Sequence, residues 1–258
     1  MDRLRITILL RKLMNPIILI PARMASTRLP NKPLADIHGK PMIVHVMERA
    51  QEARLGRVVV ACAEPEIKTA VEKAGGEAVL TDPMLPSGSD RILAALKTID
   101  ATGQHKAVIN VQGDLPTLDP TLIKVAFDLL SGPTTDIGTL AALIVKEAEK
   151  TNPNVVKAIA EIDFGKNQKT GRALYFSRTT TPWGEGPLLH HIGLYAYKRP
   201  ALEKFVAAPP SVLEKREKLE QLRALALGLR IDVALVDTVP LGVDTPDDLE
   251  AARRALQR

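Results

Sequence analysis

Residues 17–34, IILIPARMASTRLPNKPL, place a short apolar run directly before a loop with three cations and three prolines. The cations are Arg23, Arg28 and Lys32. Guanidinium and ammonium groups suit a phosphate ligand, and prolines restrict a loop so that less entropy is lost on binding. A solvated basic surface loop would have the same composition. The loop therefore indicates an anion site that needs support from elsewhere in the chain.

Further apolar runs of the same kind alternate with segments of helical periodicity. We predict strands at 17–21, 57–61, 77–80 and 107–112, and helical faces within 43–50, 67–74, 92–99 and 119–130. Continuous apolar runs are typical of strands buried on both faces, and their alternation with helices indicates a parallel sheet. The sequence therefore predicts an α/β fold with a mostly parallel central sheet and helices on both faces.

The rhythm changes after residue 135, where strand-like segments follow one another with little helix between them. We predict strands within 137–145, 155–160, 172–177, 191–198 and 231–236, and helices at Val212–Leu227 and 246–256. Asp119 and Thr245 each precede a proline and are expected to cap helices. Because no linker-like stretch divides the chain, we expect one domain over residues 15–258 with a strand-rich insertion at about 135–210.

Composition limits the possible partners. Aromatic residues make up only 3% of the 258 residues, which argues against the stacking platforms that bind single-stranded nucleic acid. The first thirteen residues hold four of the 35 basic and one of the 30 acidic residues, so the remainder carries 31 against 29, a balance of +2. We therefore expect no nucleic-acid partner and a small anionic substrate.

The beginning of the chain, residues 1–14, is charged and then apolar. Its apolar part is too short for a secretory signal and no small-residue cleavage site follows, so we expect a dispensable tail with Met14 as the usual start. A membrane-surface anchor is the alternative. No segment has a membrane-spanning length, so we expect no membrane insertion. The single Cys62 excludes an internal disulfide and suits a reducing environment, so we expect a cytoplasmic location.

Two acidic motifs complement the basic loop. VQGDLP at 111–116 places Asp114 at the end of a predicted strand, where ligands of parallel sheets bind, and GVDTPDDL at 242–249 contains Asp244. A turn aspartate and a helix-capping cluster would explain the two motifs separately. Cations for phosphates together with carboxylates for a metal indicate phosphoryl or nucleotidyl transfer. The chain has no GxGxxG and no Walker motif.

From about Ile17 to its C-terminus, the chain resembles the family of 3-deoxy-manno-octulosonate (Kdo) cytidylyltransferases. The resemblance rests on an ordered set of motifs: PARMASTRLPNKPL, GKPMIVHV, PSGSDR, NVQGD, ALYFSR, HIGLYAY, LEQLR and GVDTPDDL. It implies a Rossmann-like nucleotidyltransferase fold, usually a homodimer, whose strand-rich insertion contributes to the sugar pocket and the dimer contact. It also implies the reaction of CTP with Kdo to give CMP-Kdo and diphosphate, with Mg²⁺ as cofactor, for lipopolysaccharide biosynthesis.

The resemblance further assigns roles to individual residues. Those assigned to the nucleotide are Ala22, Arg23, Arg28, Lys32, Ser87, Gly88 and Arg91. Asp114 and Asp244 would bind magnesium and, with Arg23 and Lys32, would be catalytic. Those assigned to the sugar are Gln112, Arg178, His191, Tyr195, Glu220 and Gln221.

Physical chemistry supports these assignments unevenly. The carboxylate of Kdo needs a donor such as Arg178, whereas Glu220 and Gln221 also fit an amphipathic helix surface and His191 also fits a core histidine. Leu115 stands where the family usually has glutamate. The chain also has Ala61-Cys62-Ala63 where the family tends to read ATD, and a short segment between Arg178 and His190.

Three alternative functions stay open at this point. One is transfer to another acidic sugar, such as an 8-amino Kdo analogue or a sialic acid. The others are a nucleotide-sugar glycosyltransferase, which would consume an activated sugar, and a non-catalytic nucleotide-binding module.

Overall fold

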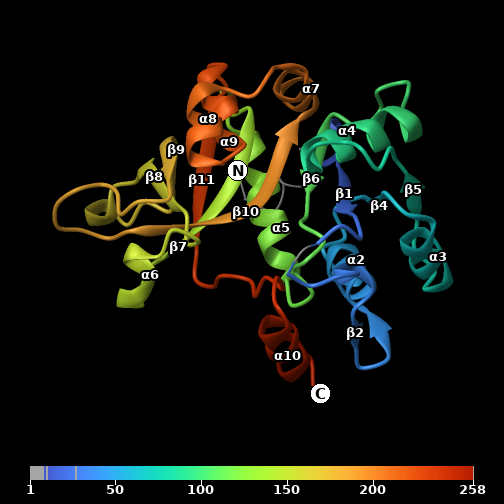
Figure 1. Cartoon of the computed structure of the whole chain (residues 1–258). Helices are drawn as coiled ribbons and strands as arrows, with labels where there is room; N and C mark the ends of the chain where they lie inside the picture. Colours follow the sequence, from blue (N-terminus) through green and yellow to red (C-terminus); the bar gives the residue numbers. More distant parts are fainter. Residues whose placement is uncertain (1–8, 10, 27, 258) are drawn as a thin grey trace. The chain divides into compact units, whose positions relative to one another are not determined.

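A computed structural model of the protein describes residues 9, 11–26 and 28–257, which form two compact units (Figure 1). The terminal unit contains Ile8–Lys124 and Pro240–Arg258, and the central unit contains Val125–Val239. We expected a single domain with an insertion at about 135–210. The central unit instead begins earlier and ends later than that insertion. Most of the predicted tail lies outside the described residues, and residues 11–14 are helical.

Parallel strands form the centre of the terminal unit. They are β1 (Ile17–Ala22), β4 (Arg57–Cys62), β5 (Ala78–Leu80) and β6 (Ala107–Asn110), in the order β5-β4-β1-β6. Their pairings are all parallel, and Ile17 lies opposite both Arg57 and Val108. The four strands predicted from apolar runs are thereby confirmed. Because the strands are parallel, the segments that follow β1, β4 and β6 leave the sheet at the same edge.

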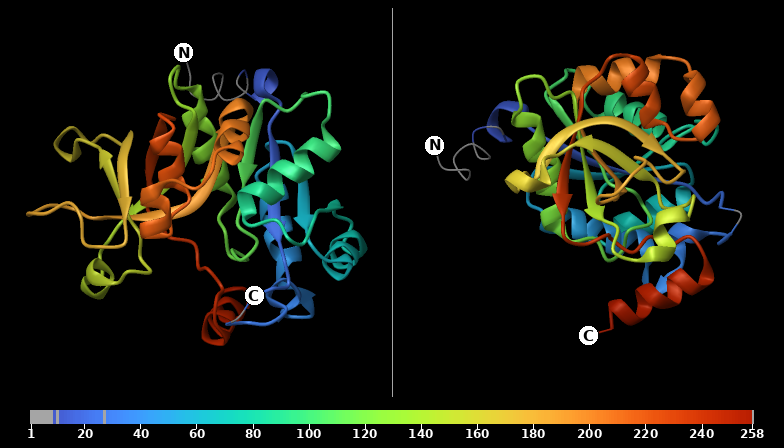
Figure 2. Two further views of the ribbon diagram at one scale, coloured as in Figure 1. Left: turned by 45° about the horizontal axis from the view of Figure 1, so that its top comes forward. Right: turned by 90° about the vertical axis from the view of Figure 1, so that its left-hand side faces the viewer.

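Amphipathic helices cover this sheet. They are α2 (Met42–Glu52), α3 (Pro65–Lys73) and α4 (Gly88–Ile99), and α5 (Pro120–Asp128) begins after β6. Helices α2 and α3 contact each other and pack on β4, whereas α4 packs on β1 and β4 and lies in front of the strands in Figure 2 (left). The predicted cap of α5 is confirmed, since the Thr121 amide donates to Asp119 Oδ1 at 2.8 Å.

The segment that follows β1 packs against the last helix in the terminal unit. A small hairpin of β2 (Asp36–Ile37) and β3 (Lys40–Pro41), which was not predicted, follows the one-turn 3-10 helix η1 (Lys32–Leu34). Buried Ile37 and Met42 form one apolar cluster with Val243 and with residues of the last helix, α10 (Pro246–Ala255). This cluster fixes the segment around Asp244 beside the basic loop that follows β1.

The central unit has strands of mixed direction. They are β7 (Ile137–Leu143), β8 (Lys157–Glu161), β9 (Thr170–Ser177), β10 (Leu189–Lys198) and β11 (Ile231–Val236), in the order β10-β7-β11-β9-β8. Among the described strands of this unit, β7 and β11 pair in parallel, and the pairings of β10 with β7, β11 with β9, β8 with β9 and β10 with β8 are antiparallel. The prediction of a mostly parallel sheet therefore needs correction: it describes the terminal unit, while the central unit is mixed.

Short helices complete the central unit. They are α6 (Glu147–Thr151), α7 (Arg199–Ala207), α8 (Val212–Glu217) and α9 (Gln221–Ala226), with the 3-10 turns η2 (Leu129–Ser131) and η3 (Phe164–Lys166). The prediction of one helix over Val212–Leu227 was wrong, because Lys218 takes a left-handed conformation with φ of 56° and ends α8. Helix α7 was not predicted.

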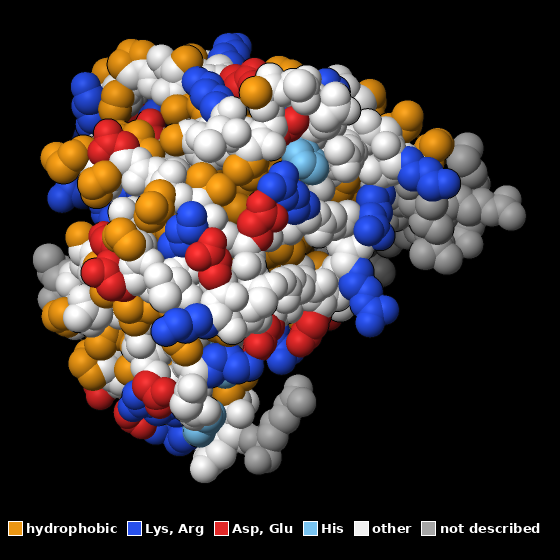
Figure 3. Space-filling view, turned by 90° about the vertical axis from the view of Figure 1, so that its right-hand side faces the viewer, with side chains coloured by type: hydrophobic (Ala, Val, Ile, Leu, Met, Phe, Trp, Pro, Cys, Tyr) orange, Lys and Arg blue, Asp and Glu red, His pale blue; other side chains and the backbone are white. Residues whose placement is uncertain are grey.

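On the face drawn in Figure 3, Lys and Arg side chains are interspersed with Asp and Glu. This mixture agrees with the weak net charge of the sequence beyond its first residues. None of the helices in the described part of the chain has the length and apolarity that crossing a bilayer requires.

Candidate active site

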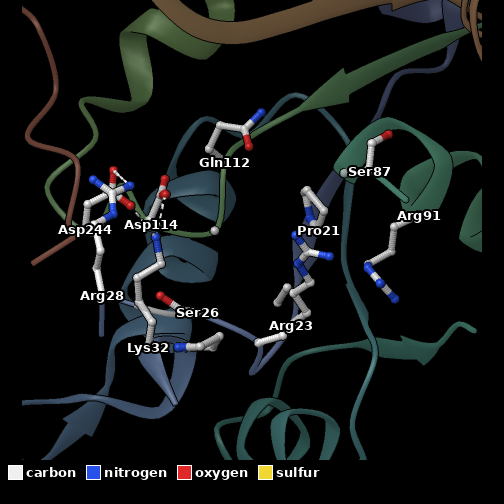
Figure 4. Close-up of a pocket in the computed structure, with 15 residues that line it drawn as sticks. Pro21, Arg23, Ser26, Arg28, Lys32, Ser87, Arg91, Gln112, Asp114 and Asp244 are labelled. Atoms are coloured by element: carbon white, nitrogen blue, oxygen red, sulfur yellow. Dashed lines mark hydrogen bonds and ion pairs between the residues drawn. The ribbon is translucent and has the colours of Figure 1, made fainter. Parts of the chain in front are cut away.

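An open pocket of about 470 Å³ lies in the terminal unit where the segments after β1 and β6 meet the start of α4 (Figure 4). All seven residues predicted to bind the nucleotide line it, together with Gln112, Asp114 and Asp244. The other lining residues are Pro21, Ala25, Ser26, Pro33 and Gly113. The pocket thus joins segments that are more than two hundred residues apart in sequence, from Arg28 to Asp244. The parallel sheet places the segments after β1 and β6, and the apolar cluster that contains Val243 places Asp244.

Two hydrogen bonds constrain the basic loop, one to Glu64 before α3 and one within the loop. The amide of Met24 donates to Glu64 Oε2 at 3.0 Å, and the amide of Leu29 donates to Ser26 Oγ at 3.3 Å. Asn31 then takes a left-handed conformation with φ of 56° and starts the turn of η1 that carries Lys32. The cations are therefore presented by a constrained loop, as the prolines predicted.

Close backbone packing around Pro21 positions the other two segments. A Cβ atom on Gly113 would lie 2.7 Å from the carbonyl oxygen of Pro21, so this position requires glycine. A Cβ atom on Gly88 would lie 3.2 Å from Pro21 Cγ, so the N-terminus of α4 also approaches the end of β1 closely. Gln112 and Asp114, on either side of Gly113, are thereby placed at the pocket.

Asp114 and Asp244 share one cation, Lys32. Lys32 Nζ lies 2.9 Å from Asp114 Oδ2 and 3.0 Å from Asp244 Oδ1. The two carboxylate oxygens are therefore no farther apart than the sum of these distances, well within the limit of about 10 Å for sharing one metal ion. Burial alone would lower the pKa of Lys32, but the two carboxylates outweigh burial and raise it. The predicted approach of the two loops is confirmed.

The segment around Asp244 caps a helix and contributes to the pocket at once. Thr245 forms a reciprocal capping box with Asp248 at the start of α10, and the Asp244 amide donates to Asp248 Oδ2 at 3.1 Å. The Asp244 side chain meanwhile contacts Arg28 at 3.0 Å. The capping interpretation of GVDTPDDL and the ligand interpretation are therefore both compatible with the structure.

Leu115 has a packing role that the sequence did not reveal. Its side chain is 8% exposed, and a Cβ atom on Gly242 would lie 3.8 Å from Leu115 Cδ2. The adjacent backbone is joined as well, since the Val243 amide donates to Asp114 O at 2.9 Å. Leucine thus helps to hold the Asp114 segment against the Asp244 segment, which is a physical reason for an apolar residue at this position.

Arg91 lies on the opposite side of the pocket from the carboxylates (Figure 4). It is only 2% exposed, and its Nη1 donates to Thr81 Oγ1 at 2.6 Å and to the carbonyl of Asp82 at 3.1 Å. Its Nη2 is buried and has no hydrogen-bond partner among the described residues. Burial, with the nearby charge of Arg23, lowers the pKa of Arg91. Arg91 therefore keeps one buried donor that no described residue engages.

Charges in the pocket favour an anion. Four cations and two carboxylates line it, which leaves two net positive charges. The described residues include no group of three or more His, Cys, Asp or Glu that could hold a metal. Two carboxylates are nevertheless a suitable partial shell for magnesium, which binds through one or two carboxylates and takes further ligands from phosphates and water.

The remaining residues assigned to the sugar lie in the central unit, where Arg178 is engaged by main-chain groups. Its Nε donates to the carbonyl of Glu217 at 2.7 Å, its Nη1 to Pro153 O at 2.9 Å and its Nη2 to Lys218 O at 3.3 Å. The guanidinium therefore secures the left-handed turn between α8 and α9. A sugar carboxylate would have to compete with these carbonyls.

His191 and Tyr195 lie side by side in a buried part of the central unit. The His191 Nε2 lies 3.1 Å from Thr139 Oγ1, and its ring centroid is 5.5 Å from that of Tyr195. Burial lowers the pKa of His191 to about 3 and raises that of Tyr195. Both side chains are consequently neutral at pH 7. Gln221 is also buried, at 7% exposure, so the helix-surface interpretation fails for it, whereas Glu220 is partly exposed.

The fold and the pocket together define a class: an α/β protein with a basic loop at the carboxyl edge of its sheet, suited to a phosphorylated ligand. The chain belongs to the cytidylyltransferase family, whose sequence profile matches residues 17–231. This confirms the resemblance drawn from the motifs.

Relatives of known function are similar over nearly the whole chain. The 3-deoxy-manno-octulosonate cytidylyltransferase of Parvibaculum lavamentivorans is 66% identical over 95% of this chain and 93% of its own length. The enzyme of the same name from Rhodospirillum centenum is 64% identical over 94% and 93%. Such identity over such coverage makes the chain an enzyme of the nucleotidyltransferase type.

Solved structures agree with the fold. The structure of CMP:2-keto-3-deoxy-manno-octonic acid synthetase complexed with CTP matches with a TM-score of 0.84 and 36% identity, over 93% of this chain and 97% of that one. A 4-diphosphocytidyl-2C-methyl-D-erythritol synthase from Anaerococcus prevotii matches at 13% identity with a TM-score of 0.63, over 97% and 99%, and shows a shared fold alone.

Proposed function

We propose that this protein transfers the cytidylyl group of CTP to Kdo, giving CMP-Kdo and diphosphate. The observation that carries the proposal is the cluster of Arg28, Lys32, Asp114 and Asp244, in which cations for a triphosphate and carboxylates for a metal meet in one pocket. Full-length relatives that are named for this activity support the choice of CTP and Kdo.

The chemistry follows from where the charges lie. The anomeric hydroxyl of Kdo attacks the α-phosphorus of CTP and loses its proton to solvent, a new O–P bond forms, and the bond to diphosphate breaks. Arg23, Arg28 and Lys32, all lining the pocket, bind the phosphates and stabilise the negative charge that develops on the leaving diphosphate. Binding both substrates in fixed orientation supplies much of the remaining rate gain. Ala22, Ser87, Gly88 and Arg91 would contact the rest of the nucleotide.

Asp114 and Asp244 would hold the magnesium ion that the resemblance implies. When bound, this ion neutralises phosphate charge. The two carboxylates fit the role because each lies within 3.0 Å of one shared cation, Lys32 Nζ, in the present structure. Each also remains partly exposed to solvent. The hard oxygen ligands that they offer are those that magnesium prefers.

Roles at the sugar side divide into contact and support. Gln112 lines the pocket, so its amide is suited to bind Kdo hydroxyl groups. Tyr195, Glu220 and Gln221 are proposed as sugar contacts on resemblance alone. Arg178 bonds to the carbonyl of Glu217, and His191 bonds to the buried hydroxyl of Thr139. These contacts favour a supporting role in which the two side chains position neighbouring groups.

We also propose an oligomeric state, a cellular location and a role for the first residues. Exposed apolar side chains of the central unit, including Val145, Trp183 and Val212 at 84%, 100% and 82% exposure, support a homodimer through this unit. The buried free thiol of Cys62 suits a cytoplasmic enzyme of lipopolysaccharide biosynthesis. We further propose that residues 1–13 are dispensable. The Lys106 amide donates a hydrogen bond to the carbonyl oxygen of Met14, so the chain is attached to the terminal unit from Met14 onward.

One assay separates the candidate functions. The protein is incubated with Mg²⁺, CTP and, in turn, Kdo, the 8-amino Kdo analogue or a sialic acid, and diphosphate release is followed. We expect release with Kdo and CTP together and none with either alone. Faster release with another sugar would change the assigned substrate. A glycosyltransferase or a binding module would release no diphosphate with any pair.

A further inference from the structure

Lys32 occupies the position between the two carboxylates that are assigned to the metal. Its Nζ contacts Asp114 and Asp244 at 2.9 and 3.0 Å, and its side chain is only 16% exposed. An ion coordinated by both carboxylates would have to lie in the same space. The ammonium group of Lys32 and a divalent cation therefore compete for one location in the free protein.

The charge of the surrounding pocket also disfavours a divalent cation in the absence of nucleotide. Arg23, Arg28, Lys32 and Arg91 outnumber the two carboxylates, so a divalent cation entering alone meets a net positive pocket. A nucleoside triphosphate reverses this balance, because its phosphates bring several negative charges. Lysine is suited to moving between two anions, since its compact charge sits on a flexible four-carbon stem.

We propose that Lys32 is an internal counter-ion that keeps divalent cations off Asp114 and Asp244 until a nucleoside triphosphate draws the ammonium to itself. The carboxylates remain paired and correctly placed in the meantime. The metal consequently enters with the nucleotide or after it. Lys32 is then a positioning residue for the carboxylates as well as a phosphate ligand. The inference rests on the proposed function only in taking Asp114 and Asp244 as the metal ligands.

Binding of Mn²⁺ to the protein without nucleotide tests this directly, with free Mn²⁺ measured by its electron paramagnetic resonance signal. Lys32→Met removes the ammonium, and Lys32→Gln is a second variant that keeps a neutral hydrogen-bond donor. We expect both to bind Mn²⁺ at least about tenfold more tightly than the wild type, because the competing charge is gone. Unchanged or weaker Mn²⁺ binding by folded Lys32 variants overturns the proposal.

Two controls locate the effect. Lys40→Met removes the same charge from the same unit, but Lys40 pairs with Glu48 at 2.7 Å and does not line the pocket. We expect Lys40→Met to leave Mn²⁺ affinity unchanged. If Lys40→Met raised Mn²⁺ affinity as much as Lys32→Met does, the change would come from the net charge of the protein and the proposal would be refuted. Adding Asp244→Asn to Lys32→Met should abolish the gain. If the gain persisted, the metal would bind elsewhere and the proposal would be refuted.

Failure of this inference is distinguishable from failure of the proposed function. Wild-type protein that releases diphosphate from CTP and Kdo, while Lys32→Met gains no Mn²⁺ affinity, leaves the function standing and removes the counter-ion role. If Lys32→Met gains Mn²⁺ affinity but the wild-type protein releases no diphosphate, the counter-ion role stands and the proposed function falls.

Discussion

The pocket of the terminal unit and the predicted sugar residues of the central unit hold polar side chains in different ways. In the pocket, Arg28 and Asp244 form an ion pair with side chains 63% and 47% exposed, which a ligand can replace at little cost. In the central unit, Arg178 donates to main-chain carbonyls and His191 is buried. Arg28 and Asp244 are therefore available for ligands, whereas Arg178 and His191 are already used by the fold.

The largest expected effect separates function from stability in the pocket. Asp114→Asn and Asp244→Asn should each lower kcat by orders of magnitude and raise the magnesium requirement, because each removes the charge of a proposed magnesium ligand. The double variant should be little worse than either single one, since the pair acts as a unit. Melting temperatures should stay near the wild-type value. Near-normal turnover in either variant would remove that aspartate from the metal site.

A smaller effect is expected at the rim of the same pocket. Arg28→Ala should weaken CTP use by about tenfold to a hundredfold, corresponding to roughly 1.5–3 kcal/mol for a charge-assisted contact. Steady-state kinetics with varied CTP measure this, and circular dichroism checks the fold. An unchanged kinetic constant for CTP in folded protein would make the basic loop a solvated surface.

The opposite pattern is expected in the central unit. Arg178→Ala should lower the free energy of unfolding by roughly 1.5–3 kcal/mol, because the carbonyls of Glu217 and Lys218 lose a charged donor. Arg178→Lys should recover only part of it, since an ammonium cannot reproduce the guanidinium fork. Denaturant unfolding measures both. If Arg178→Ala were fully stable but defective in KM for Kdo, Arg178 would be a direct sugar ligand.

The pH dependence of stability sharpens the comparison further. The pKa of buried His191 is about 3 in the folded protein, against 6.5 for the free side chain. Between these values the unfolded chain binds a proton that the folded chain does not, so stability falls as pH drops below 6.5. The contribution is at most about 1.4 kcal/mol per pH unit. His191→Gln, which cannot titrate, should flatten this slope, and an unchanged slope would contradict the burial of a neutral imidazole.

The smallest effect is expected at Leu115. Replacement by glutamate, the residue usual in the family, should change kcat by no more than about one decade, or 1.4 kcal/mol of barrier. Some loss of melting temperature should accompany it, because the side chain is only 8% exposed and packs near Gly242. A large gain in activity on another sugar would instead identify position 115 as a specificity determinant.

Sequence reasoning succeeded where a local pattern determines the structure. The apolar runs gave the parallel strands of the terminal unit, and the prolines after Asp119 and Thr245 located two helix starts. The common edge of those strands then brought the Arg28–Lys32 loop and Asp114 together. Asp244 joins them through the apolar cluster of Ile37, Met42 and Val243, which the strand pattern does not predict.

The failures arose where tertiary contacts decide. Nothing in VLEKREKLEQLRALAL marks Lys218 as a helix end, since the left-handed turn is secured by Arg178 from forty residues earlier. The mixed direction of the central strands likewise depends on pairing between distant segments, such as β7 with β11. The contact of Lys32 with both carboxylates has no sequence pattern at all.

A crystal structure of the protein with CTP and Mg²⁺ would show whether the pocket of the terminal unit binds the nucleotide and the metal together. We expect triphosphate oxygens within hydrogen-bond distance of Arg23, Arg28 and Lys32. We also expect a metal about 2.1 Å from oxygens of Asp114 and Asp244, with Lys32 moved off at least one of them. Nucleotide bound outside this pocket, or Lys32 still bridging both carboxylates beside a bound triphosphate, would contradict this expectation.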